Sequence, residues 1–132
     1  MTVIDASVLT SFILMESGWE RLVDLLKNSY TIDHAVKEAS NAIWKAHRKG
    51  IISAEDASLK FQALRKLVSV NVKLVKEEEL IDQAFTLSLK YNITVYDALY
   101  IALALKLEEP LLTLDHLQAE IAEKLGVELV KI

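Results

Sequence analysis

The chain has 132 residues, of which 52% are hydrophobic, a formal net charge of −4 and no cysteine. Its length suits one domain over residues 1–132, and its composition excludes a disordered chain, disulfides, zinc knuckles and thiol nucleophiles. The lack of thiols fits a reducing cytoplasm, and the sequence has neither a leader pattern nor an apolar run long enough to span a bilayer. We therefore expect a cytoplasmic protein without membrane contact.

Short apolar runs alternate with helical patterns along the whole chain. The pattern predicts strands at residues 2–4, 30–32, 72–75, 111–113 and 127–132. It predicts helices at residues 6–14, 18–27, 34–49, 54–69, 77–90, 94–107 and 115–126. Such alternation is typical of an α/β fold with a parallel sheet covered by helices on both faces, where ligands gather at the carboxyl ends of the strands.

Two aspartates stand where an apolar strand passes into a helix. Asp5 ends the first predicted strand, which should be central, and Asp115 follows the run from Leu111 to Leu114. The ordinary explanation for both is helix capping, because an aspartate at this position accepts hydrogen bonds from free backbone amides. Their place at strand ends also allows a role in ligand binding.

Two further acids lie at the start of helices. Glu38 falls on a different stripe of its helix from the apolar residues Val36, Ala39 and Ile43, so periodicity alone favours an ordinary solvent-facing side chain. Asp97 precedes a helix that is apolar on every face and should be buried. It can form a capping box with Thr94, act as a functional carboxylate, or do both.

Convergence of the four acids would create a charge problem that a cation solves. Like charges a few ångströms apart repel one another, and carboxylate oxygens suit Mg²⁺ or Mn²⁺. Such an ion lowers the pKa of a bound water and neutralises a leaving oxygen at phosphorus. The hydroxyls of Ser7 and Thr113 lie close in sequence to Asp5 and Asp115, where they can orient the acids.

Four segments that contain these acids resemble the motifs of the PIN domain family. They are Val3-Ile-Asp5-Ala-Ser7, Val36-Lys-Glu38-Ala-Ser-Asn-Ala, Thr94-Val-Tyr-Asp97-Ala-Leu-Tyr and Leu111-Leu-Thr113-Leu-Asp115. Each motif is short, but their order and spacing agree over nearly the whole chain. The small size of the chain is similar to that of the VapC-type toxins of toxin–antitoxin pairs.

The resemblance implies a three-layer α/β/α sandwich and an endoribonuclease that depends on Mg²⁺ or Mn²⁺. It also implies an RNA substrate, a VapB-like antitoxin as partner and a homodimer. The catalytic and metal-binding residues that it implies are Asp5, Glu38, Asp97 and Asp115.

Other interpretations remain open on the sequence alone. Residues 42–73 carry seven basic and two acidic side chains, which suits a phosphate substrate but also an ordinary solvated helical hairpin. The same fold can serve as a binding or adaptor module with little catalysis. A phospho-acceptor signalling domain is disfavoured, because Asp5 has no acidic neighbour and no lysine follows the strand at residues 111–113.

Overall fold

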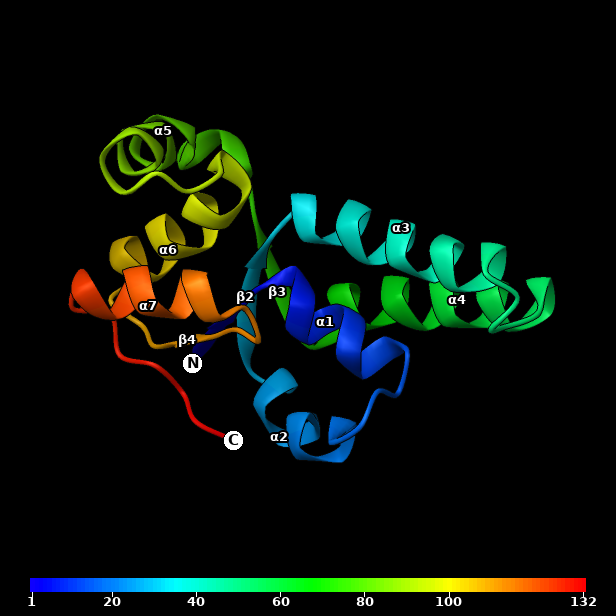
Figure 1. Cartoon of the computed structure of the whole chain (residues 1–132). Coiled ribbons are helices and arrows are strands. Elements are labelled where there is room, and N and C mark those ends of the chain that lie inside the picture. The colour runs from blue at the N-terminus through cyan, green and yellow to red at the C-terminus, as the bar shows by residue number, and fades with distance from the viewer.

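A parallel sheet of four strands, in the order β3-β2-β1-β4, forms the centre of the computed structural model, which describes residues 1–132 (Figure 1). The strands are β1 Thr2–Ile4, β2 Ser29–Ile32, β3 Val72–Val75 and β4 Leu111–Leu112. Val3 pairs with Tyr30 on one side and with Leu111 on the other, so β1 is an inner strand, as predicted. All four carboxyl ends therefore lie along one edge of the sheet.

Helices cover both faces of this sheet. They are α1 Ala6–Ile13, α2 Val23–Leu26, α3 His34–Arg48, α4 Ala54–Val70, α5 Ile81–Tyr91, α6 Val95–Leu107 and α7 His116–Lys124. In Figure 1, α5, α6 and α7 lie on one side of the sheet, and α1, α3 and α4 lie on the other. This arrangement confirms the predicted α/β/α sandwich around a parallel sheet.

Helix α6 is buried on every face, as its sequence predicts. Its residues from Ala98 to Ala104 are all buried, and α6 packs against β1, β2, α5 and α7. The Thr94 side chain caps its first turn by accepting a hydrogen bond from the Asp97 amide at 3.2 Å. A helix surrounded by protein has little freedom to shift, so it is a rigid support for side chains at its start.

Helices α3 and α4 pack side by side and extend away from the sheet; we call residues 34–70 the α3–α4 arm (Figure 1). Gly50 lies in the turn between them at φ +78°, a backbone conformation that glycine adopts without strain. The core is one continuous cluster of 30 buried hydrophobic residues, which supports the proposal that residues 1–132 form a single domain. No helix combines the length and apolar character that a membrane span requires.

Three predicted elements differ from the structure. The last predicted strand, 127–132, is only a single parallel bridge between Leu129 and Leu111, because β4 is too short to support a longer ladder. Residues 18–27 form the 3₁₀ turn Trp19–Leu22 followed by the short α2. The predicted helix 77–90 begins as a separate 3₁₀ turn, Glu77–Glu79, since the Glu77 amide donates to Asp33 Oδ1 at 3.0 Å.

Shortening one buried side chain of α6 tests the role of this helix in the core. We expect Leu103→Ala, at a fully buried position, to lower the free energy of unfolding by about 2–5 kcal/mol because it leaves a cavity. Leu89→Ala on α5, where the leucine is 73% exposed, should change it by less than about 0.5 kcal/mol. Urea unfolding followed by circular dichroism measures both, and equal effects would contradict the assignment of α6 to the core.

Candidate active site

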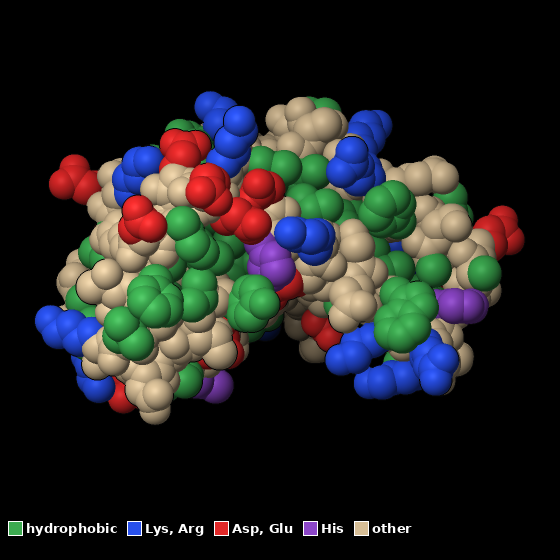
Figure 2. Space-filling model, turned by 90° about the horizontal axis from the view of Figure 1, so that it is seen from above, with side chains coloured by type: hydrophobic (Ala, Val, Ile, Leu, Met, Phe, Trp, Pro, Cys, Tyr) green, Lys and Arg blue, Asp and Glu red, His purple; other side chains and the backbone are tan.

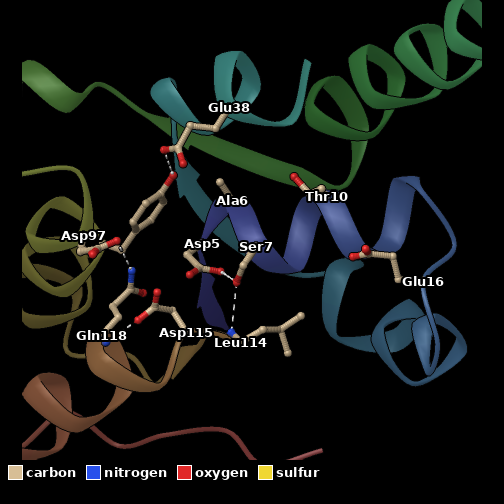
Figure 3. Close-up of a pocket in the computed structure, with 11 residues that line it drawn as sticks. Asp5, Ala6, Ser7, Thr10, Glu16, Glu38, Asp97, Leu114, Asp115 and Gln118 are labelled. Carbon is tan, nitrogen blue, oxygen red and sulfur yellow. Dashed lines mark hydrogen bonds between the residues drawn. The ribbon is translucent and has the colours of Figure 1, made fainter. Parts of the chain in front are cut away.

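Five acidic side chains and no basic one line a cavity of about 430 Å³ beside the carboxyl ends of β1 and β4 (Figure 3). The lining residues are Asp5, Ala6, Ser7, Thr10, Glu16, Glu38, Asp97, Tyr100, Leu114, Asp115 and Gln118. The four acids singled out in the sequence therefore meet at one cavity, although they come from four separate segments of the chain. An anionic ligand could enter only with a cation to offset this charge.

Asp5 lies at the end of β1 and is the most buried of these acids, with 3% of its surface exposed. Its Oδ1 accepts hydrogen bonds from the Val8 amide and the Ser7 hydroxyl, and its Oδ2 accepts one from the Thr113 hydroxyl. The bond from Val8 is the helix cap that the sequence predicts. Asp5 thus caps α1 and faces the cavity at the same time.

The two hydroxyls that bond Asp5 are themselves oriented by the loop after β4. Ser7 Oγ accepts a hydrogen bond from the Leu114 amide at 3.0 Å, and Thr113 Oγ1 accepts one from the Asp115 amide at 3.0 Å. Each hydroxyl therefore has its proton free to donate to Asp5. This network holds the loop after β4 against the end of β1 (Figure 3).

Asp97 forms only half of the predicted capping box. Thr94 accepts from the Asp97 amide, but the Asp97 carboxylate accepts from Gln118 Nε2 at 3.3 Å and makes no bond back to the backbone at Thr94. Asp115 caps α7, as predicted, by accepting from the Gln118 amide at 2.8 Å. Gln118, which is 1% exposed, therefore bonds both acids, while its own Oε1 has no hydrogen-bond partner (Figure 3).

Burial raises the pKa of Asp5, and the charge of Asp115 adds to this effect, although the bonds from Ser7, Thr113 and Val8 oppose it. Burial and the nearby charge of Asp115 also raise the pKa of Asp97. Both carboxylates are thus less stable as anions than free aspartate. A divalent cation between them would remove this penalty.

Glu38 does not occupy the ordinary solvent face that its helical periodicity favours. Its Oε1 accepts a hydrogen bond from the Tyr100 hydroxyl at 3.0 Å, and His34 Nε2 lies 3.3 Å from the same oxygen. Burial, reinforced by the Glu38 charge, raises the pKa of Tyr100, so the phenol keeps its proton and donates it. The contact joins α3 to α6 across the cavity.

No three acidic or histidine side chains lie close enough together to hold one ion without moving. Each acid is instead turned toward its own partner: Asp5 toward Ser7 and Thr113, Glu38 toward Tyr100, and Asp97 toward Gln118. Mutual repulsion between like charges favours this separated arrangement. Side-chain rotations would be required to bring the carboxylates onto a shared ion.

The sequence reasoning missed Glu16, Tyr100 and Gln118. Tyr100 ends the third of the segments that resemble the family motifs, and Gln118 lies three residues after the fourth. Both are buried, and a polar side chain at a buried position requires a hydrogen-bond partner, which could have drawn attention to them. Glu16 had no such signal, because it follows α1 in a turn whose direction depends on Met15, at φ +54°. Asp33, which also ends a strand, caps α3 and does not line the cavity.

The arrangement of the four acids agrees with a comparison of the sequence with known protein families. Residues 2–124 match the sequence model of the PIN domain. The chain belongs to the PIN domain family. The match spans most of this PIN domain and includes all four acids, Asp5, Glu38, Asp97 and Asp115.

Individual relatives support the same family. The chain is 36% identical over 121 residues to a protein named Ribonuclease VapC3 from Pyrobaculum aerophilum, and this match covers 89% of the chain and 92% of the relative. The fold of the chain is similar to that in the crystal structure of PAE2754 from Pyrobaculum aerophilum, with a TM-score of 0.73 and 23% identity. This match covers 94% of the chain and 92% of PAE2754. FitAcB from Neisseria gonorrhoeae is similar with a TM-score of 0.64, 15% identity, and 99% and 97% covered.

The raised pKa of Asp97 predicts a pH dependence of stability for the metal-free PIN domain. The folded protein binds the Asp97 proton more tightly than the unfolded chain, so stability present at low pH is lost as the pH rises from about 3.8 through the raised pKa. We expect Asp97→Asn to remove this loss and to raise the melting temperature at neutral pH, since an asparagine Oδ1 still accepts from Gln118.

Thermal unfolding in EDTA between pH 4 and pH 8 measures this effect. Asp82→Asn, the same substitution at an exposed position on α5, is the matched control and should not raise the melting temperature. A wild-type protein that gains stability over the same pH range relative to Asp97→Asn would contradict the sign of the shift.

Proposed function

We propose that this PIN domain is a divalent-metal-dependent endoribonuclease that hydrolyses RNA phosphodiester bonds. The observation that carries the proposal is the cavity lined by five acids and no base at the carboxyl ends of the strands. A cavity with this charge repels a phosphate unless a cation lies between them. The similarity to a protein named as a ribonuclease supports RNA as the substrate.

The residues present fit Mg²⁺ or Mn²⁺. The donors at the cavity are carboxylate, hydroxyl and amide oxygens, which are the ligands these ions prefer, and no cysteine or histidine lines it. Two of the carboxylates, Asp5 and Asp97, have raised pKa values for which a bound cation would compensate. When bound, such an ion supplies charge neutralisation at the phosphate and activates water for attack.

The side chains have distinct roles in this proposal. Asp5 and Asp97 would hold the ion most tightly, and Glu38 and Asp115 would complete the site or help to hold a second ion. Ser7 and Thr113 fix the Asp5 carboxylate through hydrogen bonds, and Tyr100 fixes Glu38 in the same way. Positioned ligands of this kind reduce the reorganisation needed when substrate binds.

The basic charges of the chain lie outside the cavity. Between residues 42 and 73 they are Lys45, Arg48, Lys49, Lys60, Arg65, Lys66 and Lys73, most of them on the α3–α4 arm. Basic side chains bind the phosphate backbone of a nucleic acid without regard to sequence. We propose that the arm holds the RNA backbone while the acids act on one bond.

The biological role proposed is that of the toxin of a VapBC-type toxin–antitoxin pair. The similarity to Ribonuclease VapC3 over 92% of that protein supports it. A VapB-like antitoxin as partner, a homodimer and a cytoplasmic location stay predictions of the family resemblance.

Metal-dependent cleavage is the direct test. We expect the purified protein to cut members of a mixed set of structured and single-stranded RNAs with Mn²⁺ or Mg²⁺ and not in EDTA. Asp97→Asn should lower kcat/KM by about two orders of magnitude or more, because it removes a charged ligand, while Asp82→Asn should retain activity. Gel analysis of end-labelled RNA measures both.

Two results would contradict the nuclease. Cleavage that survives EDTA or Asp97→Asn would come from a contaminant. A wild-type protein that binds Mn²⁺ and RNA but cuts nothing would be an adaptor, and Asp97→Asn would then leave partner binding unchanged.

The hydroxyl that orients Asp5 gives a second, independent test. Thr113→Val keeps the shape of the side chain but removes the donor to Asp5 Oδ2, so Mn²⁺ affinity should fall about 10- to 100-fold. Thr86→Val on α5, where the hydroxyl bonds only the Asp82 carbonyl, is the control and should leave the affinity unchanged. Isothermal titration with Mn²⁺ measures both, and equal affinities for the two variants would refute the positioning role of Thr113.

A further inference from the structure

A second hollow of about 390 Å³ lies directly beside the acidic cavity. It is lined by His34, Lys37, Glu38, Asn41 and Tyr96, and it shares Glu38 with the cavity. Apart from Glu38, none of its residues is used by the proposed cleavage. Its other side chains offer an aromatic ring, an ammonium group and an amide around the shared Glu38.

Two turns of helix face each other across the junction of α3 and α6. His34 and Glu38 are four residues apart on α3, and Tyr96 and Tyr100 are four residues apart on α6, so each pair lies on one face of its helix. Tyr100 donates to Glu38, and Tyr96 stacks on His34 with ring centroids 4.9 Å apart and an interplanar angle of 24°. The inner pair borders the acidic cavity and the outer pair borders the hollow.

The outer pair is held in place but leaves Tyr96 open to solvent. The His34 side chain is only 19% exposed and lies between two acids, 3.3 Å from Glu38 and 3.9 Å from Glu77. Tyr96 is 57% exposed, although one face of its ring covers His34. A fixed aromatic ring with a free face is a stacking surface for another flat ring.

A charged and a neutral polar group accompany this ring. Lys37 lines the same hollow, and its ammonium group lies 3.8 Å from Glu77 while the side chain remains 69% exposed. Asn41 lies one turn further along α3 and is exposed. An ammonium group suits a phosphate, and an amide suits the hydrogen-bonding edge of a base.

We propose that this hollow binds a single-stranded nucleotide of the RNA next to the bond that is cut. Its base stacks on Tyr96, its phosphate contacts Lys37, and Asn41 contacts the base edge. The proposal rests on the proposed RNA substrate. The shared residue Glu38 places the nucleotide next to the acids. Figure 2, which looks down on the molecule, shows a histidine between its two halves with acidic, basic and hydrophobic side chains around it. Because stacking requires an unpaired base, the site selects single strands over duplexes.

Binding and cleavage are measured separately. Short single-stranded RNAs carrying 2-aminopurine at one position in turn are titrated into the Asp97→Asn protein, which does not cut them. The substitution Tyr96→Ala is combined with Asp97→Asn, and Tyr96→Phe, which keeps the aromatic ring, is combined with Asp97→Asn in the same way. Phe85→Ala on α5 is the matched control, because Phe85 is 55% exposed and lies outside the hollow.

We expect Tyr96→Ala to weaken RNA binding roughly 5- to 150-fold and to abolish the quenching of 2-aminopurine, because one stacked base is lost. Tyr96→Phe and Phe85→Ala should bind as the parent does. In the active protein, Tyr96→Ala should raise KM with little change in kcat. Lys37→Gln should reduce the slope of log K against log salt by about 0.7, since one phosphate contact is lost.

Each opposite result has one meaning. If Tyr96→Ala binds and quenches as Phe85→Ala does, the subsite is overturned, and metal-dependent cleavage by the wild type would still support the nuclease. If quenching depends on Tyr96 but the wild type cuts no RNA, binding of a nucleotide in the hollow stands, whereas the nuclease fails and with it the placement next to a cut bond. If Tyr96→Ala impairs only the binding of a protein partner, the hollow is a protein-docking site and the proposal is overturned.

Discussion

Burial of the Asp5 carboxylate at the end of an inner strand is the constraint around which the site is built. A carboxylate with 3% exposure is costly unless every oxygen is satisfied. Here a backbone amide and two hydroxyls supply the bonds, and those hydroxyls accept in turn from the loop after β4. Satisfying one buried acid therefore positions the loop that carries Asp115.

This arrangement leaves an imbalance of charge that has a functional consequence. Asp115 lies close enough to Asp97 for its charge to raise the pKa of Asp97, and no base lines the cavity. The metal-free protein therefore carries an electrostatic penalty that cation binding can release. In the proposed function, the same acids that destabilise the metal-free protein would give it affinity for a divalent ion.

Two local groups of charge lie in different parts of the molecule. Five acids line the cavity at the sheet edge, whereas most bases of residues 42–73 lie on the α3–α4 arm. If acidic and basic side chains were interspersed at the cavity, the bases would neutralise the acids and weaken the attraction that the cavity would have for a cation. The facing turns of α3 and α6 connect these regions, because they place an acid and an aromatic pair side by side.

Local sequence was sufficient wherever the cause is local. The inner strand β1, the caps Asp5 and Asp115, and the buried helix α6 were predicted correctly, because hydrophobic periodicity and capping depend on neighbours within a few residues. The meeting of the four acids was anticipated only from the family resemblance together with the rule that parallel strands share one carboxyl edge.

The tertiary structure decided what depends on partners distant in the chain. The direction of Glu38 follows from Tyr100, which is 62 residues away, and the half-formed capping box follows from Gln118 on α7. The predicted strand 127–132 reduced to one bridge, because its neighbour β4 offers only two residues for pairing. The sequence by itself determined most of the segments that form strands, helices and caps, but not the last predicted strand or the 3₁₀ turns. Only packing determined which side chains meet, since the rotation of each helix is set by the surface it packs against.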